Sequence, residues 1–163
     1  ILYSKEAVQV KFTNVNCLSH NETWVHVYEC RLKAVNRNLT IFNVNELLKY
    51  PANDITLDMQ LFKRANGYKP WLIKTVVDVC RALRKAYNPY ARLVYSLFKD
   101  FSNINHSCPY YPGPIIVKGF YVNPAQFPLP LPTGEYLIAL KWLYHKKLVI
   151  STNIYFSFTE NYI

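Results

Sequence analysis

The sequence predicts a mainly β protein, an antiparallel β-sandwich of two sheets with a helical insertion at about residues 78–101. Several segments alternate apolar and polar residues with a period of two, which is typical of half-buried strands. One segment between them repeats its apolar residues at helical spacing instead. Cys80 and Cys108 flank the expected helices, so a disulfide between them would close the insertion. A length of 163 residues indicates a single domain spanning residues 1–163.

Four strands are expected before the insertion, and they are residues 7–13, 24–35, 38–48 and 54–64. The last has the clearest alternation, because its apolar residues from Ile55 to Leu61 are separated by single polar residues. Residues 65–67 (Ala-Asn-Gly) predict a turn, because Asn and Gly tolerate positive φ. Residues 70–73 are interpreted as a further strand, with a change to helix near Val77.

The insertion contains one clearly predicted helix, residues 88–101. Asn88 and Pro89 suit its start, because Asn is a favoured N-cap and Pro a favoured first helical residue. Apolar side chains then recur along one helical face, at Val94, Leu97, Phe98 and Phe101. An apolar, partly aromatic helix face is removed from water by packing on another element, so we expect the helix to pack against the sheets.

Three strands are expected after the insertion, residues 115–122, 134–145 and 148–158, with a hairpin turn at 145–147. Residues 123–132 contain four prolines, so they are expected to form a loop or a ragged edge. About seven short strands in all favour a β-sandwich. Such sheets normally pack about 10 Å apart. If they splay, the same inner faces line a cavity for an apolar ligand, and the sequence leaves both arrangements open.

The four cysteines allow three disulfide pairings. We favour pairing between nearest neighbours. Cys17–Cys30 would then join two adjacent strands and Cys80–Cys108 would close the helical insertion, each stabilising the fold by roughly 3 kcal/mol. The cysteines have no C-x-x-C spacing and the histidines are scattered, so no metal site is expected.

The net charge of +9 makes acidic lipid head groups, nucleic acid and cell surfaces conceivable partners. Basic and aromatic residues interleave around Lys63, Arg64 and Lys69, a pattern that nucleic-acid-binding surfaces share. The basic residues are nevertheless spread over the whole chain without a dense tract. We therefore expect no nucleic-acid partner.

Several features predict an extracellular protein. The chain has no apolar run long enough to cross a membrane, and it opens with Ile1, which we interpret as a processed form with its signal peptide removed. Asn21, Asn38 and Asn105 each begin an N-x-Ser/Thr triplet. We expect all three to be exposed and at least one to carry a glycan. Together with the cysteines, these features favour secretion.

Several short motifs are shared with one known family, and they are FTNVNC at 12–17, CRLK at 30–33, FKR at 62–64, GYKP at 67–70, VDVC at 77–80, NP at 88–89, NHSCP at 105–109 and GEY at 134–136. Over roughly residues 8–158 the chain resembles the insect CheB-related secreted proteins, long catalogued as a domain of unknown function. That family is distantly similar to the ML lipid-recognition superfamily, which includes the ganglioside-activator protein. The resemblance implies one ML-like, disulfide-bonded sandwich that holds a lipid or pheromone-like molecule, with a role in chemosensation or lipid presentation. It implies no catalytic residues.

Motifs of enzymes are absent from the sequence. It contains no G-x-S-x-G elbow, P-loop, H-E-x-x-H or calcium loop, and its carboxylates have no paired spacing that suggests acid–base work. Asp78 lies between two valines and is interpreted as a structural hydrogen-bond partner or helix cap. We expect a non-enzymatic protein without a cofactor.

The sequence thus predicts an apolar ligand between the sheets, beneath the helix at 88–101. The expected wall residues are those of the period-two faces, namely Met59, Leu61, Tyr136, Ile138, Leu140, Trp142, Ile154 and Phe156. The expected lid consists of Val94, Leu97 and Phe101, with Trp71 nearby. Lys63, Arg64 and Lys69 are candidates to pair with an anionic head group, although a solvated loop explains them equally well. The alternative is a closed-core secreted module that binds a receptor or another extracellular protein without a lipid.

Overall fold

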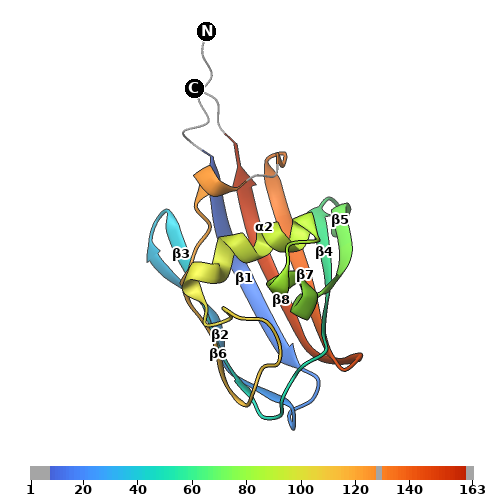
Figure 1. The fold of residues 1–163 in the computed structure, drawn as a ribbon. Coiled ribbons are helices and arrows are strands. Elements are labelled where there is room, and N and C mark those ends of the chain that lie inside the picture. Colours follow the sequence, from blue (N-terminus) through green and yellow to red (C-terminus); the bar gives the residue numbers. More distant parts are fainter. Residues whose placement is uncertain (1–7, 128–129, 161–163) are drawn as a thin grey trace.

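The computed structural model describes residues 8–127 and 130–160, and in them eight strands form two antiparallel sheets (Figure 1). The strands are β1 (Gln9–Ser19), β2 (Val25–Asn36), β3 (Leu39–Leu48), β4 (Ile55–Arg64), β5 (Tyr68–Asp78), β6 (Gly113–Phe120), β7 (Gly134–Tyr144) and β8 (Lys147–Thr159). The helices are α1 (Val79–Arg84), α2 (Pro89–Phe98) and the short 3-10 helices η1 (Lys99–Phe101) and η2 (Pro124–Gln126). The predicted mainly β fold with a helical insertion is confirmed, and each of the eight strands overlaps one of the expected segments.

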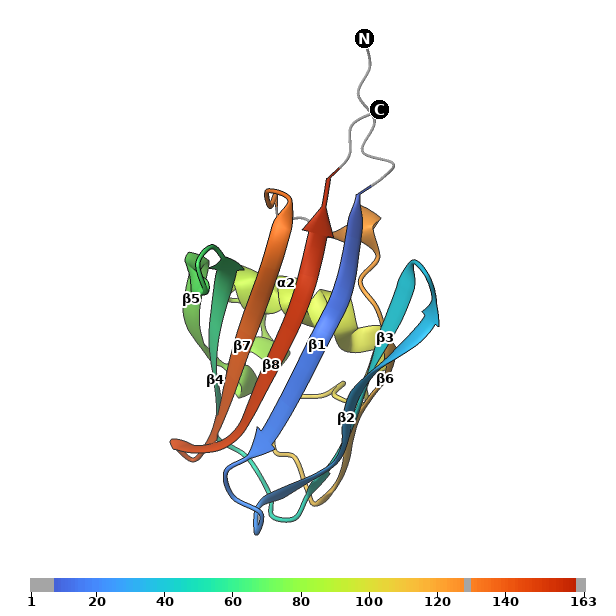
Figure 2. The same cartoon turned by 180° about the vertical axis from the view of Figure 1, so that it is seen from behind.

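The larger sheet has the strand order β1-β8-β7-β4-β5, and the smaller has the order β2-β3-β6. Figure 2 shows the long strands β1, β8 and β7 running side by side. Helix α2 lies across one face of this sheet, in front of β8 and β7 in Figure 1 and behind them in Figure 2. Among the described residues, no helix is long and apolar enough to span a membrane.

The centre of the larger sheet follows the predicted alternation. In β4 every second residue from Ile55 to Leu61 is buried, and the residues between them are half-buried. Antiparallel pairing places Met59 opposite Leu140 and Leu61 opposite Ile138 of β7. Cross-strand neighbours on one face lie close together, so the two strands present one continuous apolar surface.

The first strand is longer than predicted. Ala7, the first residue of the expected strand, lies outside the described residues, and β1 continues past Thr13 to Ser19. A register shift against β8 occurs between Phe12 and Asn14. After this bulge the residues packed against the core fall at odd positions, such as Val15, instead of even ones. The regular alternation of apolar and polar residues therefore ends near Thr13, although the strand itself continues to Ser19.

The other boundaries follow local chemistry. Strand β5 ends at Asp78 and α1 begins at the next residue, as the expected change near Val77 requires. Asn66 and Gly67 have φ of 58° and 85°, which confirms the predicted turn. At the β7–β8 hairpin, His145 and Lys146 both have positive φ, as a type I′ turn demands.

Both predicted disulfides are present, and no cysteine is free. Cys17 belongs to β1 and Cys30 to β2, so this bridge joins two consecutive strands, as expected. The two strands lie in different sheets, so the bridge also links the sheets. The second bridge, Cys80–Cys108, closes a separation of 28 residues that includes the helices of the insertion.

Candidate functional site

A cavity of ≈ 360 Å³ lies between the two sheets and beneath α2. Ligand sites in proteins commonly measure about 300–1,000 Å³. One side, which we call the sheet wall, consists of β4, β7 and β8. The opposite side consists of residues 79–101, which we call the cover. Strands β1, β3, β5 and β6 and some loop residues also contribute to the lining, which is overwhelmingly apolar.

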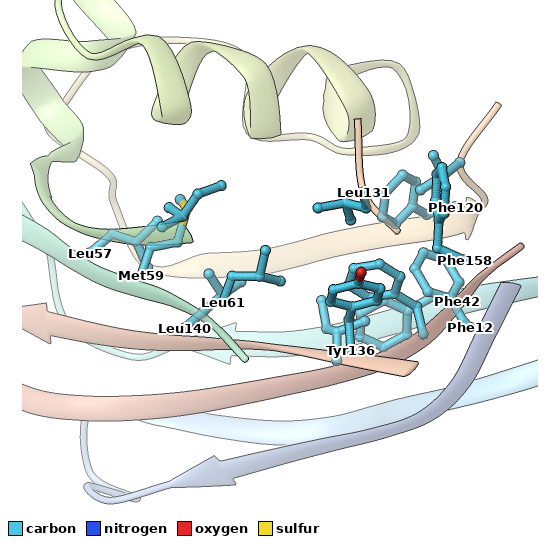
Figure 3. Close-up of a cluster of buried hydrophobic side chains, with 14 of the residues drawn as sticks. Phe12, Phe42, Leu57, Met59, Leu61, Phe120, Leu131, Tyr136, Leu140 and Phe158 are labelled. Carbon is cyan, nitrogen blue, oxygen red and sulfur yellow. The ribbon is translucent and has the colours of Figure 1, made fainter. Parts of the chain in front are cut away.

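Most of the predicted wall residues do line this cavity. From the sheet wall these residues are Met59, Leu61, Ile138, Leu140, Trp142, Ile154 and Phe156. Met59, Leu61 and Leu140 are buried, and Figure 3 shows their side chains pointing from the sheet toward the helix. They share one face because alternate residues of paired strands point the same way.

The cover contributes Val94 and Leu97 to the lining, both from α2. Asn88 caps this helix, because its side-chain oxygen accepts hydrogen bonds from Tyr90 N at 3.0 Å and Ala91 N at 3.1 Å. No residue of α2 is fully buried, although the helix carries a strong apolar stripe. The stripe borders the cavity, and its partly buried residues Val94, Leu97 and Phe98 also pack against the core.

Several side-chain hydrogen bonds hold the cover in addition to its disulfide. The Asn88 side-chain amide donates to Thr75 Oγ1 of β5 at 3.0 Å. The Tyr95 hydroxyl donates to the Ile104 carbonyl at 2.8 Å. Ser107 Oγ donates to the Cys80 carbonyl at 2.9 Å, beside the bridge. These hydrogen bonds connect the cover to β5 and to the segment that follows the cover.

Three residues predicted near the ligand lie outside the lining. Tyr136 is fully buried, stacks on Phe156 with ring centroids 5.4 Å apart, and donates its hydroxyl to the Pro132 carbonyl at 2.6 Å. Phe101 packs on Phe120 at 5.5 Å. Trp71 is half-buried beneath the Lys63 ammonium.

The three basic residues proposed as head-group partners also lie outside the lining. Lys63 Nζ lies 5.9 Å from the ring centroids of both Trp71 and Tyr136. Arg64 forms an ion pair with Glu135, with 2.6 Å between the nitrogen and the oxygen. Lys69 is exposed and lies opposite Lys63 in the β4–β5 register.

One carboxyl group in the lining was missed by the sequence reasoning. Glu46 of β3 is only 8% exposed, and its Oε2 atom has no hydrogen-bond partner among the described residues. Burial raises the pKa of this carboxyl group to about 7. It also raises the pKa of Tyr144, with the charge of Glu46 as a second cause. The sequence pattern could have identified Glu46, because it alternates in step with Phe42, Val44 and Leu48, which are the apolar residues on the inward face of β3.

The structure also places the other polar residues for which the sequence predicts a role. Asp78 caps α1, as interpreted, by accepting a hydrogen bond from Arg81 N at 3.2 Å. Among the described residues, no cluster of three metal-ligating side chains is found. Asn38 and Asn105 are exposed, as expected, whereas Asn21 is half-buried. The Asn21 side chain accepts hydrogen bonds from Thr23 instead.

A family described as "Protein of unknown function (DUF1091)" matches residues 57–138. The matched segment includes most of β4, all of the cover and the first residues of β7. It therefore contains one strand of the sheet wall together with the helices that face it. No curated protein matches the chain.

Proposed function

The chain belongs to the family described as "Protein of unknown function (DUF1091)", and we propose that it is a non-enzymatic protein that binds a lipid or another apolar small molecule between its sheets. The observation that carries this proposal is the apolar cavity of ≈ 360 Å³ beneath α2. Protein interiors are close-packed and contain few voids larger than a water molecule. A space of this size, lined by the inward faces of strands from both sheets, suits an apolar ligand.

The energetics favour a ligand that binds through its hydrocarbon part. Removing apolar surface from water stabilises a complex by about 25 cal/mol per Å². The lining offers aliphatic side chains such as Met59, Leu61 and Leu140 on one side and Val94 and Leu97 on the other. Methionine suits this role because its unbranched thioether adapts to irregular contents.

We also propose that the protein acts outside the cell. Two disulfides persist best in an oxidising compartment. The exposed Asn38 and Asn105 are available for glycosylation in a secretory pathway. The resemblance to the insect CheB-related proteins and, more distantly, to the ML superfamily supports a chemosensory or lipid-presenting role for the bound molecule.

Replacement of Leu140 by Trp tests the proposal, because a large ring at this position would fill the space. The wild-type protein should bind the apolar fluorescent probe phenylnaphthylamine, and Leu140→Trp should lose most of this binding. Overpacking typically lowers stability by about 1–3 kcal/mol, so thermal unfolding must confirm a folded variant. The matched control is Lys141→Trp, since Lys141 is exposed on the outer face of the same strand.

Mass spectrometry of gently purified protein should in addition detect a co-purified lipid. If the wild-type protein binds neither the probe nor any member of a broad lipid panel, the proposal fails. The closed-core module that binds a receptor through its surface would then take its place. Equal binding by Leu140→Trp and the wild-type protein would place the ligand elsewhere.

A further inference from the structure

We infer that the ligand carries a hydroxyl group that donates a hydrogen bond to Glu46, and that the protein thereby selects long-chain alcohols over carboxylic acids and amines. This inference rests on the proposed function, because it specifies the ligand class of the same cavity. It starts from the one carboxyl group in the cavity lining of the described residues.

The position of Glu46 is unusual for a carboxyl group. It follows Phe42 and Val44 on the inward face of β3, the central strand of the smaller sheet, and precedes Leu48 on the same face. All four residues are buried. Buried polar groups almost always have hydrogen-bond partners, and an unpaired one is costly. An unpaired acceptor atom that borders an apolar cavity therefore indicates a ligand with a donor group.

A second polar group lines the cavity. Tyr144 belongs to β7 of the larger sheet, whereas Glu46 belongs to β3 of the smaller sheet, and both border the space between the sheets. No hydrogen bond joins the two side chains among the described residues. A hydroxyl group both donates and accepts. A ligand alcohol placed between them would donate to the Glu46 carboxylate and accept from the Tyr144 phenol.

Charged head groups fit this position poorly. A carboxylate would place a second negative charge beside Glu46, which disfavours ionisation of both. An ammonium group carries three donors and would lose its water in a lining that is otherwise apolar. Arg92 is the lining residue with a cationic side chain, and it is exposed to solvent. The uncharged hydroxyl is thus the head group that the polar atoms match.

The test uses displacement of phenylnaphthylamine by four ligands with the same chain: dodecanol, dodecyl methyl ether, dodecanoic acid and dodecylamine. The measurements are made at about pH 8, which is above the Glu46 pKa of about 7. The carboxyl group is then ionised, so it accepts hydrogen bonds without donating any. Dodecanol should displace the probe at the lowest concentration. The ether keeps the oxygen and the chain but lacks the donor, so it isolates the hydrogen bond.

Variants then assign the selectivity to Glu46. In Glu46→Leu the ratio of the affinity for dodecanol to the affinity for dodecyl methyl ether should fall about tenfold. A hydrogen bond to a charged group typically contributes an affinity difference of about this size. Glu46→Gln should keep part of the preference, because its amide oxygen still accepts. The control is Glu29→Leu, since Glu29 lies on β2 outside the lining, and it should leave the ratio unchanged.

Each outcome is decisive. Tightest binding of the acid or the amine by the wild-type protein would overturn the inference, and so would an unchanged ratio in Glu46→Leu. If Glu46→Leu does not fold, the wild-type panel and Glu46→Gln still test the preference for the alcohol. Absence of phenylnaphthylamine binding by the wild-type protein would instead defeat the proposed function, which separates the two failures.

Discussion

The sheet wall and the cover face the same cavity but are built in different ways. In the sheet wall, Met59 and Ile150 are 1% and 2% exposed, and each strand is paired along its length with its neighbours. In the cover, α2 has no buried residue, and it is held by one disulfide, a few side-chain hydrogen bonds and the packing of partly buried apolar side chains on the core. Local stability follows such contacts. The sheet wall therefore fixes the shape of the site, and the cover is the part whose attachment controls access.

The largest expected effect comes from removing the bridge that closes the insertion. In Cys80→Ser/Cys108→Ser, loss of a cross-link over 28 residues should lower the free energy of unfolding by about 3–4 kcal/mol. If the cover is then docked in about one molecule in ten, the apparent dissociation constant of phenylnaphthylamine rises about tenfold. Urea unfolding and probe titration measure the two effects.

The other bridge provides the matched control. Cys17→Ser/Cys30→Ser removes a cross-link over 13 residues between the sheets, so stability should fall by about 3 kcal/mol. The cover remains closed in this variant, and the affinity of the folded protein for the probe should change little. Equal losses of affinity in both double variants would show that access does not depend on the attachment of the cover.

The same comparison explains what the sequence could predict. The faces of β4, β7 and α2 were predictable because each repeats with one period over its whole length. The continuation of β1 was not, because the bulge at Thr13 moves its apolar residues from even to odd positions. The link from Cys17 to the other sheet depends on which strands pair, and that is a long-range property.

Glu46 and Tyr136 show what the periodicity of a strand can and cannot predict about the site. Glu46 occupies a position that the alternation of β3 assigns to the interior, although Glu is rarely buried, and it was not among the residues predicted for the site. Conversely, Tyr136 was correctly expected to be buried on the inner face, yet it packs on Phe156 and does not border the cavity. Periodicity identifies the inward face of a strand, and only the packing of neighbouring side chains decides where that face leaves space.

Glu46 gives the next largest expected effect, as a pH dependence of stability. Burial raises its pKa to about 7, from a value of 4.5 for an exposed carboxyl group. The folded state therefore holds this proton at pH values where the unfolded state has lost it. Stability should be greatest below about pH 4.5 and fall by about 3 kcal/mol as the pH rises to 7 and above.

The variant Glu46→Gln isolates this effect, because an amide does not titrate. It should be more stable than the wild-type protein at pH 8, and the difference should shrink as the pH falls. Other ionisable residues of the cavity lining could in principle contribute to the pH dependence of stability. They are Tyr87, Tyr90, Arg92, Tyr95, Tyr110 and Tyr144. None of these normally changes charge between pH 4.5 and 8. Identical pH profiles of the two proteins would contradict the assignment to Glu46.

The smallest expected effect concerns the start of α2, and it tests whether the cover can be loosened without the sheet wall. Asn88→Ala removes the cap of the helix and the bond to Thr75 at 3.0 Å, so stability should fall by about 1 kcal/mol. Hydrogen exchange should become faster in α2 and stay unchanged in β4 and β7. The control is Asn123→Ala, because Asn123 caps η2 by the same chemistry outside the cover. Faster exchange throughout the sheet wall in Asn88→Ala would show that wall and cover open as one unit, and the distinction between them would not hold.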